Sequence, residues 1–156
     1  MIKKILFIIV CLIFETSVVF GMSLNETNTQ TGYSLVITDD AMLLSEDEIQ
    51  MLKQDMYPLT DYGNIVFYST QDGDRDYARK AHDYYYQHFQ DNSGTLLLID
   101  MYNRKVYIHS DGSNYSIITS GKAEIITDNI YRYLTNGQYY KGAQIAFSQA
   151  LSLLER

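Results

Sequence analysis

Four residues with hard oxygen atoms stand beside the patterned runs of this chain. Asp39 follows the short run LVIT, and Asp111 ends the alternating run KVYIHS. Asp91 and Asn92 precede the continuous apolar run TLLLI. Calcium is bound by about six to eight oxygen ligands that converge from flexible loops. These four residues therefore predict a metal site, with calcium as its ion, and no motif indicates an organic cofactor.

The same residues have a purely structural interpretation, which the sequence leaves open. Asp39 and its neighbour Asp40 could make turn hydrogen bonds ahead of a helix that opens at Ser45. Asp91 and Asn92 could form an ordinary polar turn, because aspartate and asparagine side chains readily bond to nearby backbone groups. The two interpretations differ in whether Asp39 and Asp91 approach one another in the fold.

The segment Asp72–Asp76 imitates a calcium-binding loop, with Asp83 at its twelfth position. Such a loop needs a glycine for its bend where this chain has Tyr77, and a glutamate at the end that binds through both oxygens. The segment is therefore interpreted as a loop in which Asp74 caps the following helix.

The familiar hydrolytic motifs are missing from the sequence. The chain has no G-x-S-x-G elbow, no P-loop and no H-E-x-x-H helix. The three histidines, His82, His88 and His109, are scattered over two helical positions and a strand. A phosphatase would have to use Asp39 and Asp91 with a bound cation that polarises the phosphate. No catalytic residue is assigned, and whether the protein is an enzyme stays open.

The first 21 residues have the order of a secretory signal peptide. Two lysines precede the apolar run 5–14, and small residues lead to a cleavage point after Gly21. Cleavage would remove Cys11, the only cysteine, and would place the remaining domain outside the cytoplasm, secreted or in the envelope. Because Glu15 interrupts the run, it is short for a membrane span, although an uncleaved anchor stays open.

Composition restricts the class of partner. The chain has 156 residues, of which 46% are hydrophobic and 20% charged, which suits one globular domain with a core. Its formal net charge of −7 argues against binding to nucleic acid or anionic lipid, both of which need basic surface. We expect an envelope or membrane protein as partner, with no direct membrane insertion after signal cleavage.

Strand and helix patterns alternate after a polar stretch, 22–32, that is predicted to be a flexible lead-in. Residues 33–156 are predicted to form one domain. The predicted strands cover 33–38, 63–70, 95–99 and 105–109. The predicted helices begin at Ser45, at Asp74, beyond Gly112 and before Ala143. This alternation predicts an α/β fold, a three-layer α/β/α sandwich with a small mixed sheet.

Tyrosine is unusually frequent, with 15 residues. Tyr84, Tyr85 and Tyr86 cannot all point inward from one helix, because consecutive helix residues face different directions. Some tyrosines must therefore lie on the surface, where they could form a recognition surface or simply cover helix seams.

Several segments occur in the order seen in TPM domains. They are Val36–Ser45, the strand opened by Gly63, Tyr77–Ala78, Asp91–Leu98 followed by Arg104, and Tyr139 or Tyr140 with Gly142. The resemblance spans about residues 33 to 155. The family includes a thylakoid-lumen acid phosphatase, photosystem repair factors, an accessory protein of nematode acetylcholine receptors and many bacterial exported proteins.

The resemblance implies an extracytoplasmic α/β/α sandwich, and some members are reported to bind calcium or hydrolyse phosphate esters. Asp39 and the pair Asp91–Asn92 correspond to acidic and amide positions of the family pattern. The chain departs from the pattern at Met42 and Ser93, which replace a usual glycine and asparagine. We expect an exported binding module that assists assembly or repair and holds calcium. The alternative is a weak metal-assisted acid phosphatase that uses the same loops.

Overall fold

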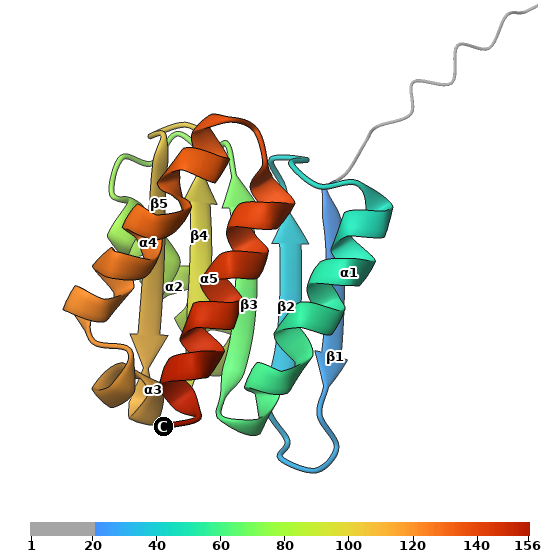
Figure 1. Cartoon of the computed structure of the whole chain (residues 1–156), viewed down its shortest axis with the longest axis vertical. Helices are drawn as coiled ribbons and strands as arrows, with labels where there is room; N and C mark the ends of the chain where they lie inside the picture. Colours follow the sequence, from blue (N-terminus) through green and yellow to red (C-terminus); the bar gives the residue numbers. More distant parts are fainter. Residues whose placement is uncertain (1–20) are drawn as a thin grey trace, which may run out of the picture.

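Five strands form one mixed sheet in the order β1-β2-β3-β4-β5 in a computed structural model that describes residues 21–156 (Figure 1). The strands are β1 Met22–Thr27, β2 Ser34–Asp39, β3 Asn64–Thr70, β4 Gly94–Asp100 and β5 Lys105–Asp111. Strands β2, β3 and β4 run parallel, and the edge strands β1 and β5 are antiparallel to their neighbours.

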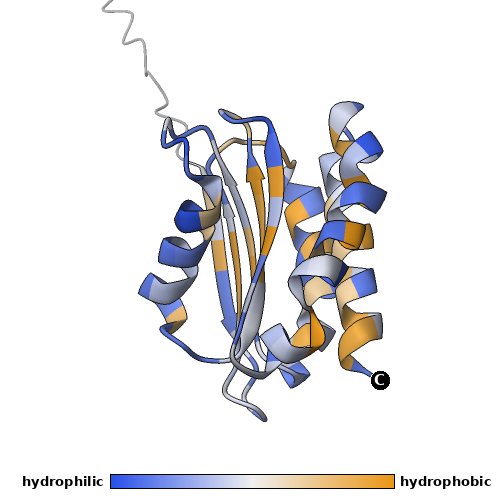
Figure 2. Ribbon diagram, turned by 90° about the vertical axis from the view of Figure 1, so that its left-hand side faces the viewer, coloured by the Kyte–Doolittle hydropathy of each residue, from blue (hydrophilic) through white to orange (hydrophobic). Residues whose placement is uncertain are grey.

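Helices cover both faces of the sheet (Figure 2). The helices are α1 Glu46–Met56, the 3-10 helix η1 Tyr57–Asp61, α2 Tyr77–Phe89, α3 Gly112–Ile117, α4 Ser120–Thr135 and α5 Tyr139–Leu154. Helix α2 packs on one face, while α1, α4 and α5 pack on the other. The predicted three-layer α/β/α sandwich with a mixed sheet is confirmed.

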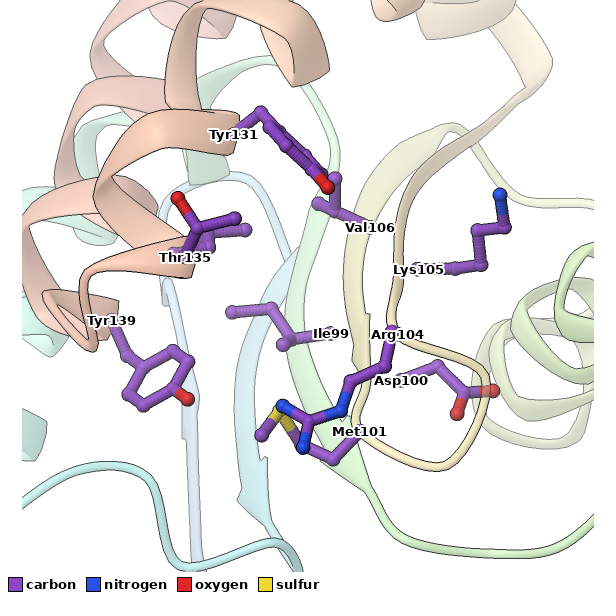
Figure 3. Close-up of a pocket in the computed structure, with 10 residues that line it drawn as sticks. Ile99, Asp100, Met101, Arg104, Lys105, Val106, Tyr131, Thr135 and Tyr139 are labelled. Carbon is purple, nitrogen blue, oxygen red and sulfur yellow. The ribbon is translucent and has the colours of Figure 1, made fainter.

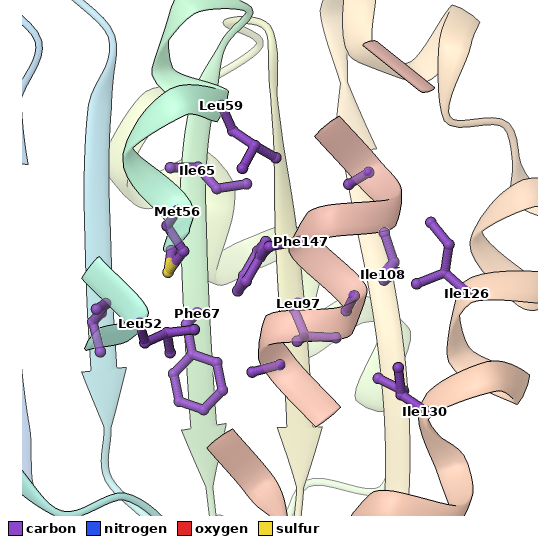
Figure 4. Close-up of a cluster of buried hydrophobic side chains, with 14 of the residues drawn as sticks. Leu52, Met56, Leu59, Ile65, Phe67, Leu97, Ile108, Ile126, Ile130 and Phe147 are labelled. Carbon is purple, nitrogen blue, oxygen red and sulfur yellow. The ribbon is translucent and has the colours of Figure 1, made fainter. Parts of the chain in front are cut away.

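Two apolar cores follow from the alternation of side chains along the strands. In β2, Leu35 and Ile37 face the larger core beneath α1, α4 and α5, while Val36 faces the smaller core beneath α2. Phe67 of β3 and Phe147 of α5 both belong to the larger core (Figure 4). The parallel strands β3 and β4 are buried along their whole length, as expected for strands with helices on both faces.

The helix starts follow capping chemistry. The predicted capping box opens α1, because the Glu48 backbone N–H donates to the Ser45 hydroxyl and the Ser45 N–H donates to the Glu48 carboxylate. The cap of α2 is Asp76 instead of the expected Asp74, and it accepts a hydrogen bond from the Arg79 N–H. Asp74 instead accepts from the Asp76 N–H, so it shapes the turn before the helix.

The stretch predicted as a flexible lead-in, 22–32, contains the ordered strand β1. Leu24 packs against the larger core, while its neighbours in the strand face outward. Beyond the strand, Asn28 is buried, and its side-chain amide donates to the Thr60 hydroxyl and the Asp61 carboxylate. Backbone pairing with β2 thus orders a polar segment that carries almost no apolar signal.

The predicted signal peptide and Cys11 lie outside the described residues, apart from Gly21 at the predicted cleavage point. Within residues 21–156, none of the helices has the length and apolar character needed to cross a bilayer.

Candidate functional site

The parallel strands divide the candidate residues between two opposite edges of the sheet. Strands β2, β3 and β4 end together, which brings Asp39, Thr70 and Asp100 to one edge, the carboxyl edge. Asp91 and Asn92 precede β4 and therefore lie at the other edge, the amino edge. Asp111 also lies there, because the end of the antiparallel strand β5 pairs with the start of β4.

The predicted metal site shared by Asp39 and Asp91 is therefore wrong as a single site. Asp39 is level with Ser69 and Ile99 in the sheet, and Gly94 begins the same strand as Ile99. The distance along β4 between those two levels is roughly 16 Å at about 3.3 Å per residue. Among residues 21–156, no three histidine, cysteine, aspartate or glutamate side chains are placed to hold one metal ion.

Asp39 has a structural role at the carboxyl edge. Its buried carboxylate accepts hydrogen bonds from the backbone N–H groups of Leu43 and Leu44, at 3.0 and 2.9 Å. The Ser69 hydroxyl also donates to it, and this hydroxyl in turn accepts from the Ala41 N–H. The carboxylate therefore fixes the loop that leads from β2 to α1, which is the turn interpretation of the sequence.

Asp100, the second aspartate of this edge, forms a buried ion pair. Its carboxylate lies 2.8 Å from the Lys80 ammonium and accepts two further hydrogen bonds from Asn103. Burial alone would raise the pKa of Asp100, but the hydrogen bonds from Asn103 and Lys80 outweigh it and hold the pKa below its ordinary value. This carboxylate is also fully engaged by neighbouring groups.

The amino edge consists of polar turns. Asp91 and Asn92 are exposed, and the Asn92 carbonyl accepts a hydrogen bond from the Tyr85 hydroxyl at 2.8 Å. Asp111 accepts a hydrogen bond from the Gly112 N–H at the start of α3. The structure thus brings Asp91, Asn92 and Asp111 to one edge and leaves Asp39 at the other.

The tyrosine run of α2 divides as predicted. Tyr85 is buried, whereas Tyr86 is 47% exposed. Tyr84 stacks on Tyr68 with ring centroids 4.0 Å apart, and its hydroxyl shares a hydrogen bond with Thr38. Burial is the main cause that raises the pKa of Tyr84. These contacts place the Tyr84 ring over strands β2 and β3, whereas the Tyr86 ring is exposed to solvent.

The three histidines do not share a site. His88 lies near Tyr84 and is exposed, whereas His82 and His109 pack with ring centroids 5.4 Å apart. Burial lowers the pKa of His109, and its Nε2 is buried without a hydrogen-bond partner among residues 21–156. In the part of the chain that the structure describes, no serine or threonine hydroxyl forms a hydrogen bond with a histidine ring; the acidic neighbours are Asp83, 3.1 Å from His82, and Asp111, 3.8 Å from His109.

Sequence reasoning missed a cavity at the carboxyl edge. It opens between the β4–β5 hairpin and the turn from α4 to α5 (Figure 3). Arg104, Tyr131 and Tyr139 line it. These residues are far apart in the sequence and carry no spacing motif. The one local signal is the basic residue Arg104 in the tight turn after β4.

Two solved structures of low sequence identity share this fold. The N-terminal domain of a protein from P. gingivalis, solved by NMR, is 16% identical with a TM-score of 0.69, over 76% of this chain and 81% of that chain. The BA42 protein from the psychrophilic bacterium Bizionia argentinensis is 15% identical with a TM-score of 0.63, over 71% of this chain and 81% of that chain. No curated protein is detectably similar to this chain.

A comparison of the sequence with models of protein families identifies the family itself. The model of the TPM domain matches residues 37–152, from within β2 to the last turns of α5. That range covers most of the chain and both edges of the sheet. The resemblance inferred from the ordered segments of the sequence is confirmed, and the chain belongs to the TPM domain family.

Proposed function

We propose that this TPM domain works outside the cytoplasm as a binding module that assists the assembly or repair of an envelope or membrane protein. The observation that carries the proposal is the state of the carboxylates at the carboxyl edge. Asp39 and Asp100 are both buried, and each is already held by hydrogen bonds from its own fold. Oxygen atoms that already accept these hydrogen bonds bind a metal or a phosphate only if the internal contacts break.

A metal-assisted phosphatase would need different geometry at this edge. The cation must have carboxylate oxygens free to bind it and an open position for the phosphate. Both oxygens of Asp39 accept backbone hydrogen bonds, so a metal would have to displace the N–H groups of Leu43 and Leu44. Buried N–H groups left without acceptors cost about 1 to 3 kcal/mol each. The internal hydrogen bonds therefore favour binding over catalysis.

Exposed tyrosines are spread over both faces and both ends of the sheet, and each could contribute to contact with a protein partner. Tyrosine gives a large contact area for few rotatable bonds, which is why interfaces are enriched in it. Four tyrosines are more than 45% exposed, namely Tyr86, Tyr102, Tyr115 and Tyr131. They project from α2, the β4–β5 turn, α3 and α4, so the proposal does not depend on one helix alone.

Calcium remains part of the proposal in a narrower form. The residues that would hold it are Asp91, Asn92 and Asp111 at the amino edge, without Asp39. A site with few protein ligands would be weak, in the range of extracellular calcium modules. Calorimetric titration should then show binding that Asp91→Ala removes and Asp39→Asn keeps. If Asp91→Ala leaves the binding unchanged, the calcium part fails.

The test of the main proposal is turnover of p-nitrophenyl phosphate by the purified protein with calcium, magnesium or no metal. We expect no rate above the buffer blank at any pH from acid to neutral. Asp39→Asn is a better control than Asp39→Ala, because it keeps the size of a buried group and one acceptor oxygen. A metal-dependent rate that this variant loses while still folded by circular dichroism would support the phosphatase instead.

A further inference from the structure

The cavity at the carboxyl edge has an apolar interior and a polar rim. It measures about 90 Å³, and we call it the Arg104 cavity. Its walls include Ile99 from β4, Val106 from β5 and Leu134 from α4. The hydroxyl-bearing side chains of its lining are Tyr131, Thr135 and Tyr139. Small-molecule sites combine an apolar lining with a few polar groups, but they usually measure about 300 to 1,000 Å³, so this cavity suits only a very small ligand.

The positive charge at the cavity mouth comes from Arg104, an exposed residue of the β4–β5 turn. Its side chain reaches toward Met101 and Tyr139, whereas Lys105 and the Asp100 carboxylate point away from the cavity (Figure 3). No ion pair or side-chain hydrogen bond found within residues 21–156 involves Arg104. Asp100 cannot neutralise it, because that carboxylate is engaged by Lys80 and Asn103. Arg104 is exposed, so it places at the mouth of the cavity one guanidinium that has no ion-pair partner among residues 21–156.

The backbone of Arg104 determines how its side chain leaves the turn. Its φ is 53°, in the left-handed region, where glycine and asparagine are favoured and other residues are strained. Arg104 closes the turn between β4 and β5, and a turn by itself would be better served by one of those two residues. Met42 and Gln90 share this conformation, so the backbone fixes the direction in which the Arg104 side chain leaves the turn and does not by itself mark a site.

The lining selects the class of ligand. A guanidinium binds planar carboxylates with two parallel hydrogen bonds. One unpaired guanidinium can neutralise the single negative charge of a carboxylate. A phosphate dianion would keep one negative charge without a partner, which is unfavourable on a chain of net charge −7. The apolar walls suit a short hydrocarbon chain next to the charged group, and the volume limits the ligand to a few heavy atoms.

We propose that the Arg104 cavity binds the carboxylate of a short apolar monocarboxylic acid. The guanidinium of Arg104 pairs with the carboxylate, and the hydrocarbon chain lies against Val106 and Leu134. The Tyr139 hydroxyl lies on the same side of the cavity as the Arg104 guanidinium, where it can donate to a carboxylate oxygen, whereas Tyr131 lies beside Val106 (Figure 3). This site goes beyond the proposed function, since it needs neither a protein partner nor a metal.

The first experiment titrates sodium isovalerate into the isotope-labelled protein and follows its amide and arginine resonances by NMR. We expect saturable shifts at Met101, Val106 and Thr135, with no such shifts for the neutral isovaleramide. Inorganic phosphate at the same ionic strength should bind at least about tenfold more weakly. The same titration is then repeated with a short peptide that ends in valine and with its C-terminally amidated form. Binding of the free-carboxylate peptide alone would identify a peptide C-terminus as a second source of the carboxylate, and binding of neither peptide would restrict the site to a free acid.

The decisive variant is Arg104→Asn, which suits the left-handed backbone but lacks the charge. It should lose isovalerate binding by about tenfold or more and show no fall in Tm. Lys105→Gln removes the neighbouring charge that points away and should bind as the unchanged protein does. Absence of isovalerate shifts, equal binding of isovaleramide, or full binding by Arg104→Asn would each overturn the proposal. These experiments measure binding and not turnover. Their outcome is therefore independent of the outcome of the phosphatase assay.

Discussion

At the scale of single residues, the buried charges of this domain serve its architecture. Asp39 holds the loop before α1, and Asp100 joins the end of β4 to Lys80 of α2. Truncation of one partner of a buried ion pair leaves an uncompensated charge, at a cost of about 3 to 5 kcal/mol. A loss of activity or binding after such a substitution therefore has to be separated from a loss of folding.

His109 gives a pH-dependent stability that can be measured. Burial lowers its pKa, so the folded state resists the proton that the unfolded chain accepts. The facing groups are the His82 and Tyr85 rings of α2 and the Asp111 carboxylate 3.8 Å away. The contribution of neutral His109 to the free energy of unfolding is fully present above the pKa of the unfolded state, about 6.5. It is lost as the pH falls from that value through the lowered pKa of the folded state. Urea denaturation across this range should show the stability falling toward acid.

The matched substitutions are His109→Gln and His88→Gln. The first should flatten the acid slope of the unfolding free energy in that pH window, because the buried titrating group is gone. The second changes an exposed ring near Tyr84 and should leave the slope as it is. Equal slopes in all three proteins would show that His109 is not the group responsible.

At the scale of elements, the sequence predicted helices and central strands because their apolar residues repeat with clear periods. The edge strand β1 escaped prediction because its partners are backbone groups and its side chains are mostly polar and exposed. The proximity of Asp39 to Asp91 was predicted from loop position alone. Asp39 follows its strand whereas Asp91 precedes a parallel one, so strand direction places them at opposite edges. The Arg104 cavity depends on how α4 and α5 pack, which no local pattern specifies.

The junction of β3, β4 and α2 at the amino edge tolerates no side chain at Gly94. A Cβ there would clash with the Asn64 carbonyl oxygen and the Tyr85 hydroxyl. Gly94→Ala should therefore destabilise the protein by about 3 kcal/mol through overpacking. Gly121 lies in α4 with open space around it, and Gly121→Ala should stabilise by about 0.5 kcal/mol. Urea denaturation of both variants measures the contrast, and a neutral Gly94→Ala would mean that the two strands separate easily.

At the scale of the whole molecule, charge and shape assign different roles to the two edges of the sheet. The carboxyl edge carries the buried and hydrogen-bonded Asp39 and Asp100, the exposed Asp40 and the Arg104 cavity, while the amino edge carries exposed polar turns. Both edges are held by one sheet and two cores, so a ligand at either edge binds to a rigid frame. The extent of the folded domain therefore matters for binding at either edge.

The predicted domain start at residue 33 and the family match at residue 37 both omit β1. A protein of residues 33–156 should be less stable than residues 21–156 by about 3 to 5 kcal/mol, since it loses a strand ladder, the packing of Leu24 and the buried amide of Asn28. Removal of β1 also exposes the edge of β2, a row of unpaired backbone groups that promotes association. Urea denaturation and size-exclusion chromatography of the two proteins measure both effects. Equal stability and a monomeric short form would show that β1 is an appendage and that the domain begins at β2.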